Sequence, residues 1–140
     1  MIWKKKLLEN FNLYAVTSFD RVTPDVLTQI DRAYRGGAGI LQLRLKSVTD
    51  QDYLRLALKV RQISRHYGRG FIINNRIDIA LAAGADGIHV GQEDLPLSYL
   101  REIVQKQEAE MIIGKSTHSI EQAMRAEEEL RMARQELGRQ

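Results

Sequence analysis

Five short apolar segments recur along the chain, and each is followed by a stretch with helical periodicity. The segments have the length of β-strands and span residues 13–17, 39–46, 71–73, 86–90 and 111–114. Helices are expected after them from residues 23, 49, 78, 96 and 119, with a further short helix at 2–9. Strands that alternate with helices form a parallel sheet through right-handed crossovers. The alternation therefore predicts the α/β class.

Two architectures satisfy this pattern. A five-stranded open sheet with helices on both faces would be complete, whereas an eight-stranded (βα)8 TIM barrel would need three more units. The strands are nearly continuous apolar runs, as expected when both faces of a sheet are covered. The chain has 140 residues, which suits a single domain spanning 1–140. We expect an incomplete TIM barrel of about five βα units, with residues 129–140 as a divergent helical tail.

The composition excludes several functional classes. Hydrophobic residues make up 44% of the chain and charged residues 28%, which is typical of a soluble globular protein. No apolar run is long enough to cross a bilayer, no secretory signal is recognised, and cysteine is absent, so a cytoplasmic protein without disulfides or membrane partners is expected. The net charge is only +3 and cations do not cluster with aromatic residues, which argues against nucleic-acid binding.

The strand expected at 39–46 carries an unusual row of polar side chains. Gln42, Arg44 and Lys46 occupy every second position, so they share one face of the strand. Leu41, Leu43 and Leu45 lie on the other face and are expected to pack under helices. The row fits either an edge strand with one wet face or an anion-binding row inside a ligand site, since buried cations require a partner of opposite charge.

Polar residues also end the later strands. Parallel strands bring their carboxyl ends to one rim, where both candidate architectures bind ligands. The residues concerned are Asn74 and Asn75 after the third strand, Gln92 and Asp94 after the fourth, and Ser116 and His118 after the fifth. Because four strands contribute, a common site is predicted at this rim.

The residue types indicate a phosphorylated ligand. Arg44 and Lys46 are strong donors to phosphate, and Ser116 precedes a helix start, where backbone N–H groups attract anions. Asp94 and an asparagine carbonyl are hard oxygen ligands of the kind that Mg²⁺ accepts beside substrate phosphate and water. The residues therefore favour a phosphorylated or pyrophosphorylated small molecule bound with magnesium.

Each of these residues also has a purely structural interpretation. The two asparagines could simply form a turn, and Asp94 could only favour the start of the next helix. His89 lies within a strand and is expected to be a hydrogen-bonded core residue rather than a ligand. His118 could be catalytic or could orient its loop, and the sequence does not decide between the two.

At these positions the chain resembles the thiamine-phosphate synthases. The resemblance covers about residues 13–128, and its glycine-rich segment is highly specific. The matching segments are Leu-Tyr-Ala-Val-Thr (13–17), Gln-Leu-Arg-Leu-Lys (42–46), Ile-Ile-Asn-Asn-Arg (72–76), Gly-Ala-Asp-Gly-Ile-His-Val-Gly-Gln-Glu-Asp-Leu-Pro (84–96) and Gly-Lys-Ser-Thr-His-Ser (114–119). The related thiazole tautomerases share the fold but usually lack Gly-Gln-Glu-Asp-Leu-Pro, so the synthase branch matches better.

The resemblance implies a (βα)8 barrel that couples hydroxymethylpyrimidine pyrophosphate to thiazole phosphate, with magnesium bound and pyrophosphate released. By motif match, four residues would hold the pyrimidine pyrophosphate, Ser116 would contact substrate, and two would hold magnesium. The first four are Gln42, Arg44, Lys46 and Asn74, and the magnesium pair is Asn75 and Asp94.

The chain departs from the family pattern in two places. Asn75 stands where the family has aspartate, and an amide is a weaker magnesium ligand than a carboxylate. After about Glu128 the family continues into three further strands and a Thr-Pro-Thr-Lys phosphate loop, which this chain lacks. We therefore expect the chain to be inactive alone or to need a partner, either another copy or a complementing chain. The alternative function is a non-catalytic phosphate-binding or regulatory module.

Overall fold

The computed structural model describes the backbone of residues 2–138 and the side chains of residues 3–132. Within these residues, helices and strands alternate along the chain. The strands are β1 (Tyr14–Val16), β2 (Ile40–Leu43), β3 (Gly70–Asn74), β4 (Gly87–Val90) and β5 (Ile112–Lys115). The helices are α1 (Ile2–Asn10), α2 (Asp25–Arg35), α3 (Asp50–Tyr67), α4 (Ile77–Ala83), α5 (Leu97–Lys106) and α6 (Ile120–Gly138). The side chains of residues 133–140, most of the predicted tail, lie outside the described part.

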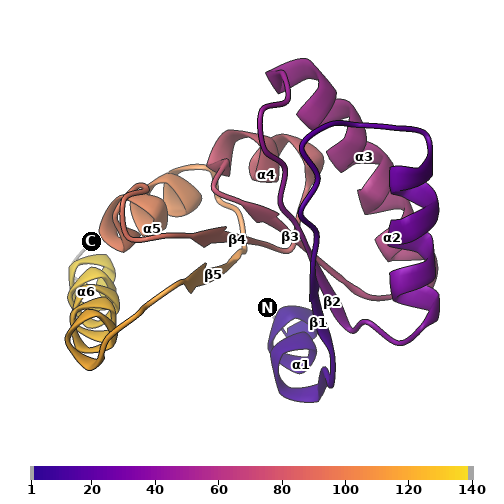
Figure 1. The fold of residues 1–140 in the computed structure, drawn as a ribbon. Coiled ribbons are helices and arrows are strands. Elements are labelled where there is room, and N and C mark those ends of the chain that lie inside the picture. The colour runs from indigo at the N-terminus through magenta and orange to yellow at the C-terminus, as the bar shows by residue number, and fades with distance from the viewer. Residues whose placement is uncertain (1, 139–140) are drawn as a thin grey trace.

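The strands form one sheet in the order β1-β2-β3-β4-β5, and all four pairs are parallel. Each strand therefore pairs with its neighbour in sequence, as in the first five units of a barrel. Figure 1 shows that the sheet is open, and in the described part of the chain β1 and β5 have no partner on their outer edges. The predicted α/β class and the five βα units are confirmed.

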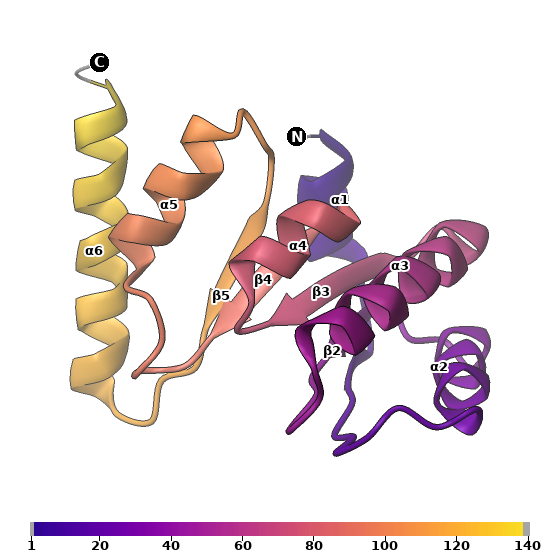
Figure 2. The ribbon, with the colours of Figure 1, turned by 90° about the horizontal axis from the view of Figure 1, so that it is seen from above.

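Helices α2 to α5 cover one face of the sheet, which we call the outer face (Figures 1 and 2). Alternate residues of β2, β3 and β4 are buried under these helices, and Ala15 of β1 and Ile113 of β5 are partly buried against the same core. The fully buried strand residues include Leu41 and Leu43 of β2, Ile73 of β3 and Ile88 of β4. The prediction that Leu41 and Leu43 pack under helices is thus confirmed, and their burial drives the association of sheet and helices.

The opposite, inner face is covered at the amino ends of the strands by α1. Leu7 of α1 packs against Ile40, Ile72 and Ile112 in a small apolar cluster. At Gly70, a Cβ atom would lie 2.5 Å from Leu7 Cδ2, so a larger residue there would require the Leu7 side chain to shift. The inner face is therefore closed by apolar packing at one end of the strands and left to polar residues at the other.

Strand β2 is shorter than predicted. We expected a strand over 39–46, whereas the regular ladder ends at Leu43 and continues only as an isolated bridge between Leu45 and Phe19. Between them, the Thr17 hydroxyl accepts the N–H of Arg44, and the carbonyl oxygen of Arg44 accepts both this hydroxyl and, at 3.5 Å, the N–H of Phe19. A side chain that replaces a backbone partner ends the regular ladder, and local spacing does not reveal it.

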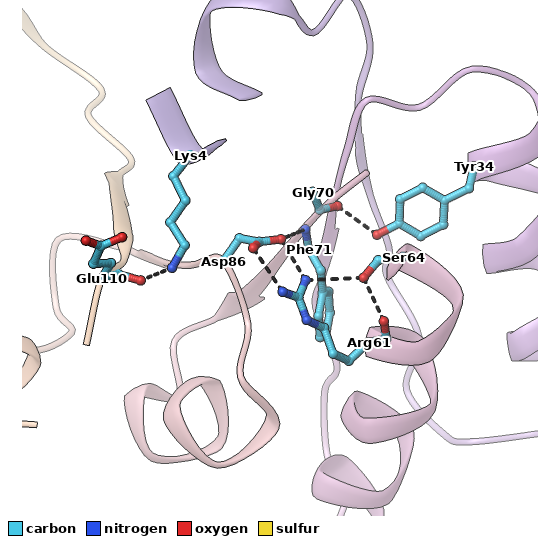
Figure 3. A network of polar contacts seen from close by, with 8 residues as sticks. All are labelled: Lys4, Tyr34, Arg61, Ser64, Gly70, Phe71, Asp86 and Glu110. Carbon is cyan, nitrogen blue, oxygen red and sulfur yellow. Dashed lines mark hydrogen bonds and ion pairs between the residues drawn. The ribbon is translucent and has the colours of Figure 1, made fainter. Parts of the chain in front are cut away.

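A buried ion pair stabilises the amino ends of β3 and β4 (Figure 3). Asp86 is fully buried, and Arg61 of α3 binds its two oxygens at 2.8 and 3.1 Å. The N–H of Phe71 donates to the same carboxylate at 2.9 Å. Nearby, Lys4 of α1 donates to the carbonyl oxygen of Glu110, just before β5. Because these contacts join α1, α3 and three strands, they fix the end of the sheet opposite the predicted rim.

No helix in the described residues is both long and apolar enough to cross a membrane.

Candidate functional site

The inner face changes from apolar to polar along the strand direction. In β3, Ile72 belongs to the apolar cluster under α1, and Asn74 follows two residues later on the same face. Strand β2 changes from Ile40 to Gln42 in the same way. The polar positions lie at the carboxyl ends of the strands, where the sequence predicted the rim.

Gln42 and Asn74 form the first half of this polar region. The Nδ2 of Asn74 donates to Oε1 of Gln42 at 2.8 Å, and the Nε2 of Gln42 donates to the Tyr14 hydroxyl at 3.0 Å. Gln42 is only 4% exposed, so these bonds satisfy an amide that would otherwise be buried without partners. Burial raises the pKa of Tyr14 above its ordinary value of 10, which keeps its hydroxyl protonated.

His89 and Ser116 form the second half. The Nε2 of His89 lies 2.8 Å from the Oγ of Ser116, and His89 is in register with Asn74 of β3. Gly114 makes room for the ring, because a Cβ there would lie 2.7 Å from His89 Nδ1. Burial lowers the pKa of His89 below its ordinary value of 6.5, and the charge of Asp94 opposes this shift. His89 is therefore hydrogen-bonded, as predicted, but it lies within the polar region.

The loop after β4 is tied to the same end of β5. The N–H of Gly91 donates to Oδ2 of Asp94 at 2.6 Å, and the Nε2 of Gln92 donates to the carbonyl oxygen of Ser116 at 2.7 Å. Asp94 thus binds the backbone of its own loop rather than the first turn of α5, which begins at Leu97. Its second carboxylate oxygen has no hydrogen-bond partner among the described residues.

Two cations follow β2 without partners. Arg44 is partly buried and Lys46 is exposed, and neither side chain forms a hydrogen bond or ion pair within the described part of the chain. By contrast, several partly buried cations of the described residues are paired, such as Lys115, whose Nζ lies 3.7 Å from Oε2 of Glu129. Unpaired cations beside the bonded amides of Gln42 and Asn74 are available to bind an anion.

Asn75 occupies a special backbone position. Its φ of 71° lies in the left-handed region that asparagine tolerates better than most residues, and its N–H donates to the carbonyl oxygen of His89 at 2.7 Å. The side chain is exposed. The turn interpretation is therefore correct for the backbone, and the amide oxygen remains free for other contacts.

The donor set at the rim fits magnesium only in a site that is shared with substrate. The described residues contain no group of three or more histidine, cysteine, aspartate or glutamate side chains that could hold a metal ion. Asp94 and Asn75 supply one carboxylate and one amide, and Mg²⁺ commonly binds one or two protein ligands together with substrate phosphates and water. The two residues are thus compatible with the predicted ion.

The structure joins some predicted residues and not others. It links Gln42 to Asn74 and Ser116 to His89, whereas the side chains of Arg44, Lys46 and Asn75 lie at the same rim without direct contacts to them. His118 is exposed, and only its backbone is bonded, to Gln122. Sequence reasoning missed Tyr14, Thr17 and Tyr53, whose hydroxyls bind groups in or beside the rim. Nothing in the local pattern marks these contacts, because each joins residues at least 21 positions apart.

A separate groove of about 220 Å³ lies at the opposite end of the sheet. Trp3, Leu7 and Phe11 line it together with Gly39 and Arg69. It adjoins α1 and the amino ends of β2 and β3, away from the polar rim. Ligands of α/β sheets bind at the carboxyl ends of strands, so the polar rim is the better candidate.

The fold places the chain among α/β proteins built from successive parallel βα units, with a polar rim at the carboxyl ends of the strands. A family model described as thiamine monophosphate synthase matches residues 13–131. The chain belongs to this family.

Individual relatives agree with this assignment. The chain is 44% identical to a thiamine-phosphate synthase of Clostridium acetobutylicum over 119 residues, which are 84% of the chain and 55% of the relative. It is 38% identical to the thiamine-phosphate synthase of Caldanaerobacter subterraneus over 121 residues, again 55% of the relative. Among solved structures, thiamine phosphate pyrophosphorylase from Pyrococcus furiosus matches with a TM-score of 0.76 and 32% identity, covering 90% of this chain and 57% of that one. The chain thus spans about half the length of these relatives.

Proposed function

We propose that the polar rim binds a pyrimidine pyrophosphate and takes part in coupling it to a thiazole phosphate, a step of thiamine biosynthesis. The observation that carries this proposal is the row of bonded inner-face groups, Gln42 with Asn74 and His89 with Ser116, beside two unpaired cations. Membership of the thiamine monophosphate synthase family supports the reaction class.

In the proposed reaction, the bond between the pyrimidine methylene carbon and the pyrophosphate oxygen breaks, and the electron pair leaves with pyrophosphate. The resulting pyrimidine-methyl cation is attacked by the lone pair of the thiazole nitrogen, which forms the new carbon–nitrogen bond. The step requires little proton transfer, so catalysis rests on orientation and charge stabilisation. Arg44 and Lys46 would stabilise the charge that develops on the leaving pyrophosphate.

The bonded amides of Gln42 and Asn74 would orient the pyrimidine. Gln42 and Asn74 are held rigidly by their mutual bond and by Tyr14, and such fixed donors lose little entropy when a ligand binds. The lowered pKa of His89 keeps the ring neutral at pH 7, so the ring adds no charge beside the developing cation. Asn75 and Asp94 would hold magnesium, which when bound neutralises pyrophosphate charge.

The test is a coupling assay with the purified chain, both substrates and magnesium, following the coupled product and released pyrophosphate. The proposal expects the chain to bind the pyrimidine pyrophosphate, and expects turnover once a second copy or a complementing chain completes the barrel. Arg44→Gln should lower either quantity at least about tenfold, the effect of losing one charge-assisted contact of about 1.4 kcal/mol. Lys59→Gln removes an exposed cation of α3 and serves as the matched control. No product and no heat of binding with the pyrimidine pyrophosphate would reject the proposal.

A non-catalytic phosphate-binding role is the second candidate, and Asn75 favours it, because an amide holds magnesium more weakly than a carboxylate. Binding of the pyrimidine pyrophosphate without turnover would support this role.

The free edge of β5 also leads us to propose association with a second copy or a complementing chain. The molar mass of the purified chain, measured by light scattering, distinguishes the two kinds of partner. A dimer indicates self-association, and a monomer indicates a partner of different sequence or none.

A further inference from the structure

Arg44 and Lys46, the two cations of the rim, lie beyond the end of strand β2. Contacts other than the regular strand ladder must therefore hold their backbone in place. The regular ladder of β2 ends at Leu43, and Arg44 is the next residue. A segment beyond the last ladder bond is free to move unless other groups bind its backbone. Binding by a displaced guanidinium would be weak, because positional errors of about 1 Å can cost a large factor in such sites.

The hydroxyl of Thr17 supplies this constraint. Its Oγ1 accepts the N–H of Arg44 at 2.8 Å and donates to the carbonyl oxygen of Arg44 at 2.9 Å. The N–H and C=O of one residue in a strand point to the same side, so a single side chain can satisfy both. Thr17 thus supplies the acceptor for the Arg44 N–H that a backbone carbonyl would otherwise supply, while the carbonyl oxygen of Arg44 also accepts the N–H of Phe19 at the longer distance of 3.5 Å.

The backbone beyond this contact follows the same path. The N–H of Lys46 donates to the carbonyl oxygen of Phe19 at 2.9 Å, and Phe19 bridges Leu45. The segment 17–19 therefore runs beside the segment 44–46, with Thr17 as its first fixed point after the ladder ends. Thr17 itself is anchored, because its N–H donates to the carbonyl oxygen of Gln42 at 3.0 Å.

We propose that Thr17 is a positioning residue of the anion site, which holds the backbone of Arg44 so that its guanidinium is directed to the pyrophosphate. The inference rests on the proposed function, since it assumes that Arg44 binds pyrophosphate. Thr17 acts through Arg44 and contacts no ligand itself. The hydroxyl is required, and the methyl group of threonine is not.

The experiment measures pyrophosphate affinity by titration calorimetry, with magnesium present and at a temperature well below the melting point of the least stable variant. Thr17→Val keeps the shape of the side chain and removes the hydroxyl, and it is expected to weaken binding at least about fivefold. Thr17→Ser keeps the hydroxyl and is expected to bind within about twofold of the unchanged protein. A role in stability alone would lower the melting temperature of Thr17→Val without changing the affinity of the folded protein.

A double-mutant cycle decides whether the effect passes through Arg44. Thr17→Val is made in the Arg44→Gln background, where we expect it to change the affinity less than about twofold. An equal loss in both backgrounds, or full affinity of Thr17→Val, would overturn the inference while leaving the proposed function intact. If the unchanged protein does not bind pyrophosphate, the proposed function fails first, and the inference falls with it.

Discussion

Asn74 donates from Nδ2 to Oε1 of Gln42 across 2.8 Å, and this bond joins the inner faces of β2 and β3 at the rim. Since Gln42 is almost fully buried, loss of the donor would leave its amide oxygen without a partner. Asn74→Ala is therefore expected to destabilise the protein by about 1–3 kcal/mol. Urea unfolding measures this, with Gln62→Ala on the exposed face of α3 as the control, expected to change stability by less than about 0.5 kcal/mol. Equal stabilities of the two variants would contradict the assigned bond.

At the other end of the sheet, breaking the buried pair of Arg61 and Asp86 is expected to lower the free energy of unfolding strongly. Arg61→Leu leaves a fully buried carboxylate whose one remaining donor among the described residues is the Phe71 N–H, and should lower the free energy of unfolding by about 3–5 kcal/mol. Arg35→Leu is the matched control, because it breaks an exposed pair with Asp31 at 3.0 Å and should cost at most about 1 kcal/mol. Denaturant unfolding of both variants gives the comparison.

A double variant distinguishes two causes of destabilisation, the loss of the attraction between Arg61 and Asp86 and the burial of an unpaired carboxylate. The double change Arg61→Leu with Asp86→Asn removes both ions, so we expect it to be more stable than Arg61→Leu alone. A double variant less stable than the single one would indicate that the carboxylate is stabilised mainly by groups other than Arg61.

His89 predicts a defined dependence of stability on pH. Its folded pKa is lowered below 6.5 by burial, so the unfolded state binds the proton more tightly than the folded state. The stability contributed by the neutral ring is thus complete above about pH 6.5 and is lost as the pH falls through the folded pKa. Unfolding free energies measured from pH 8 to pH 5 should fall more steeply for the unchanged protein than for His89→Gln. Parallel curves would show that His89 is not the responsible group.

Replacing Asn75 by aspartate is expected to raise the affinity of the proposed site for magnesium. Asn75→Asp adds a second carboxylate to the proposed pair of magnesium ligands, and magnesium affinity in the presence of pyrophosphate should increase by up to about tenfold, because carboxylates bind Mg²⁺ more strongly than amides. Asn12→Asp makes the same charge change at an exposed residue before β1 and should leave the affinity unchanged. An Asn75→Asp protein with unaltered affinity would reject the assignment of this position to magnesium.

The sequence predicted the arrangement of the strands better than the contacts at their ends. The period-2 row of Gln42, Arg44 and Lys46 predicted one shared face, and Gln42 does lie on the inner face with Asn74. It did not predict that β2 ends at Leu43, because that depends on Thr17, 27 residues away. The pair of His89 and Ser116 is also separated by 27 residues and was not foreseen. Pairings across strands depend on register, which local spacing does not encode.

The central claim is that polar groups from four successive strand ends surround one phosphate-bearing ligand. Amide chemical shifts followed during titration with pyrophosphate and magnesium test it directly. The claim predicts the largest changes at Arg44, Asn74, Asp94 and Ser116, with little change around the groove lined by Trp3 and Arg69. Changes confined to that groove, or scattered without regard to the strand ends, would contradict it.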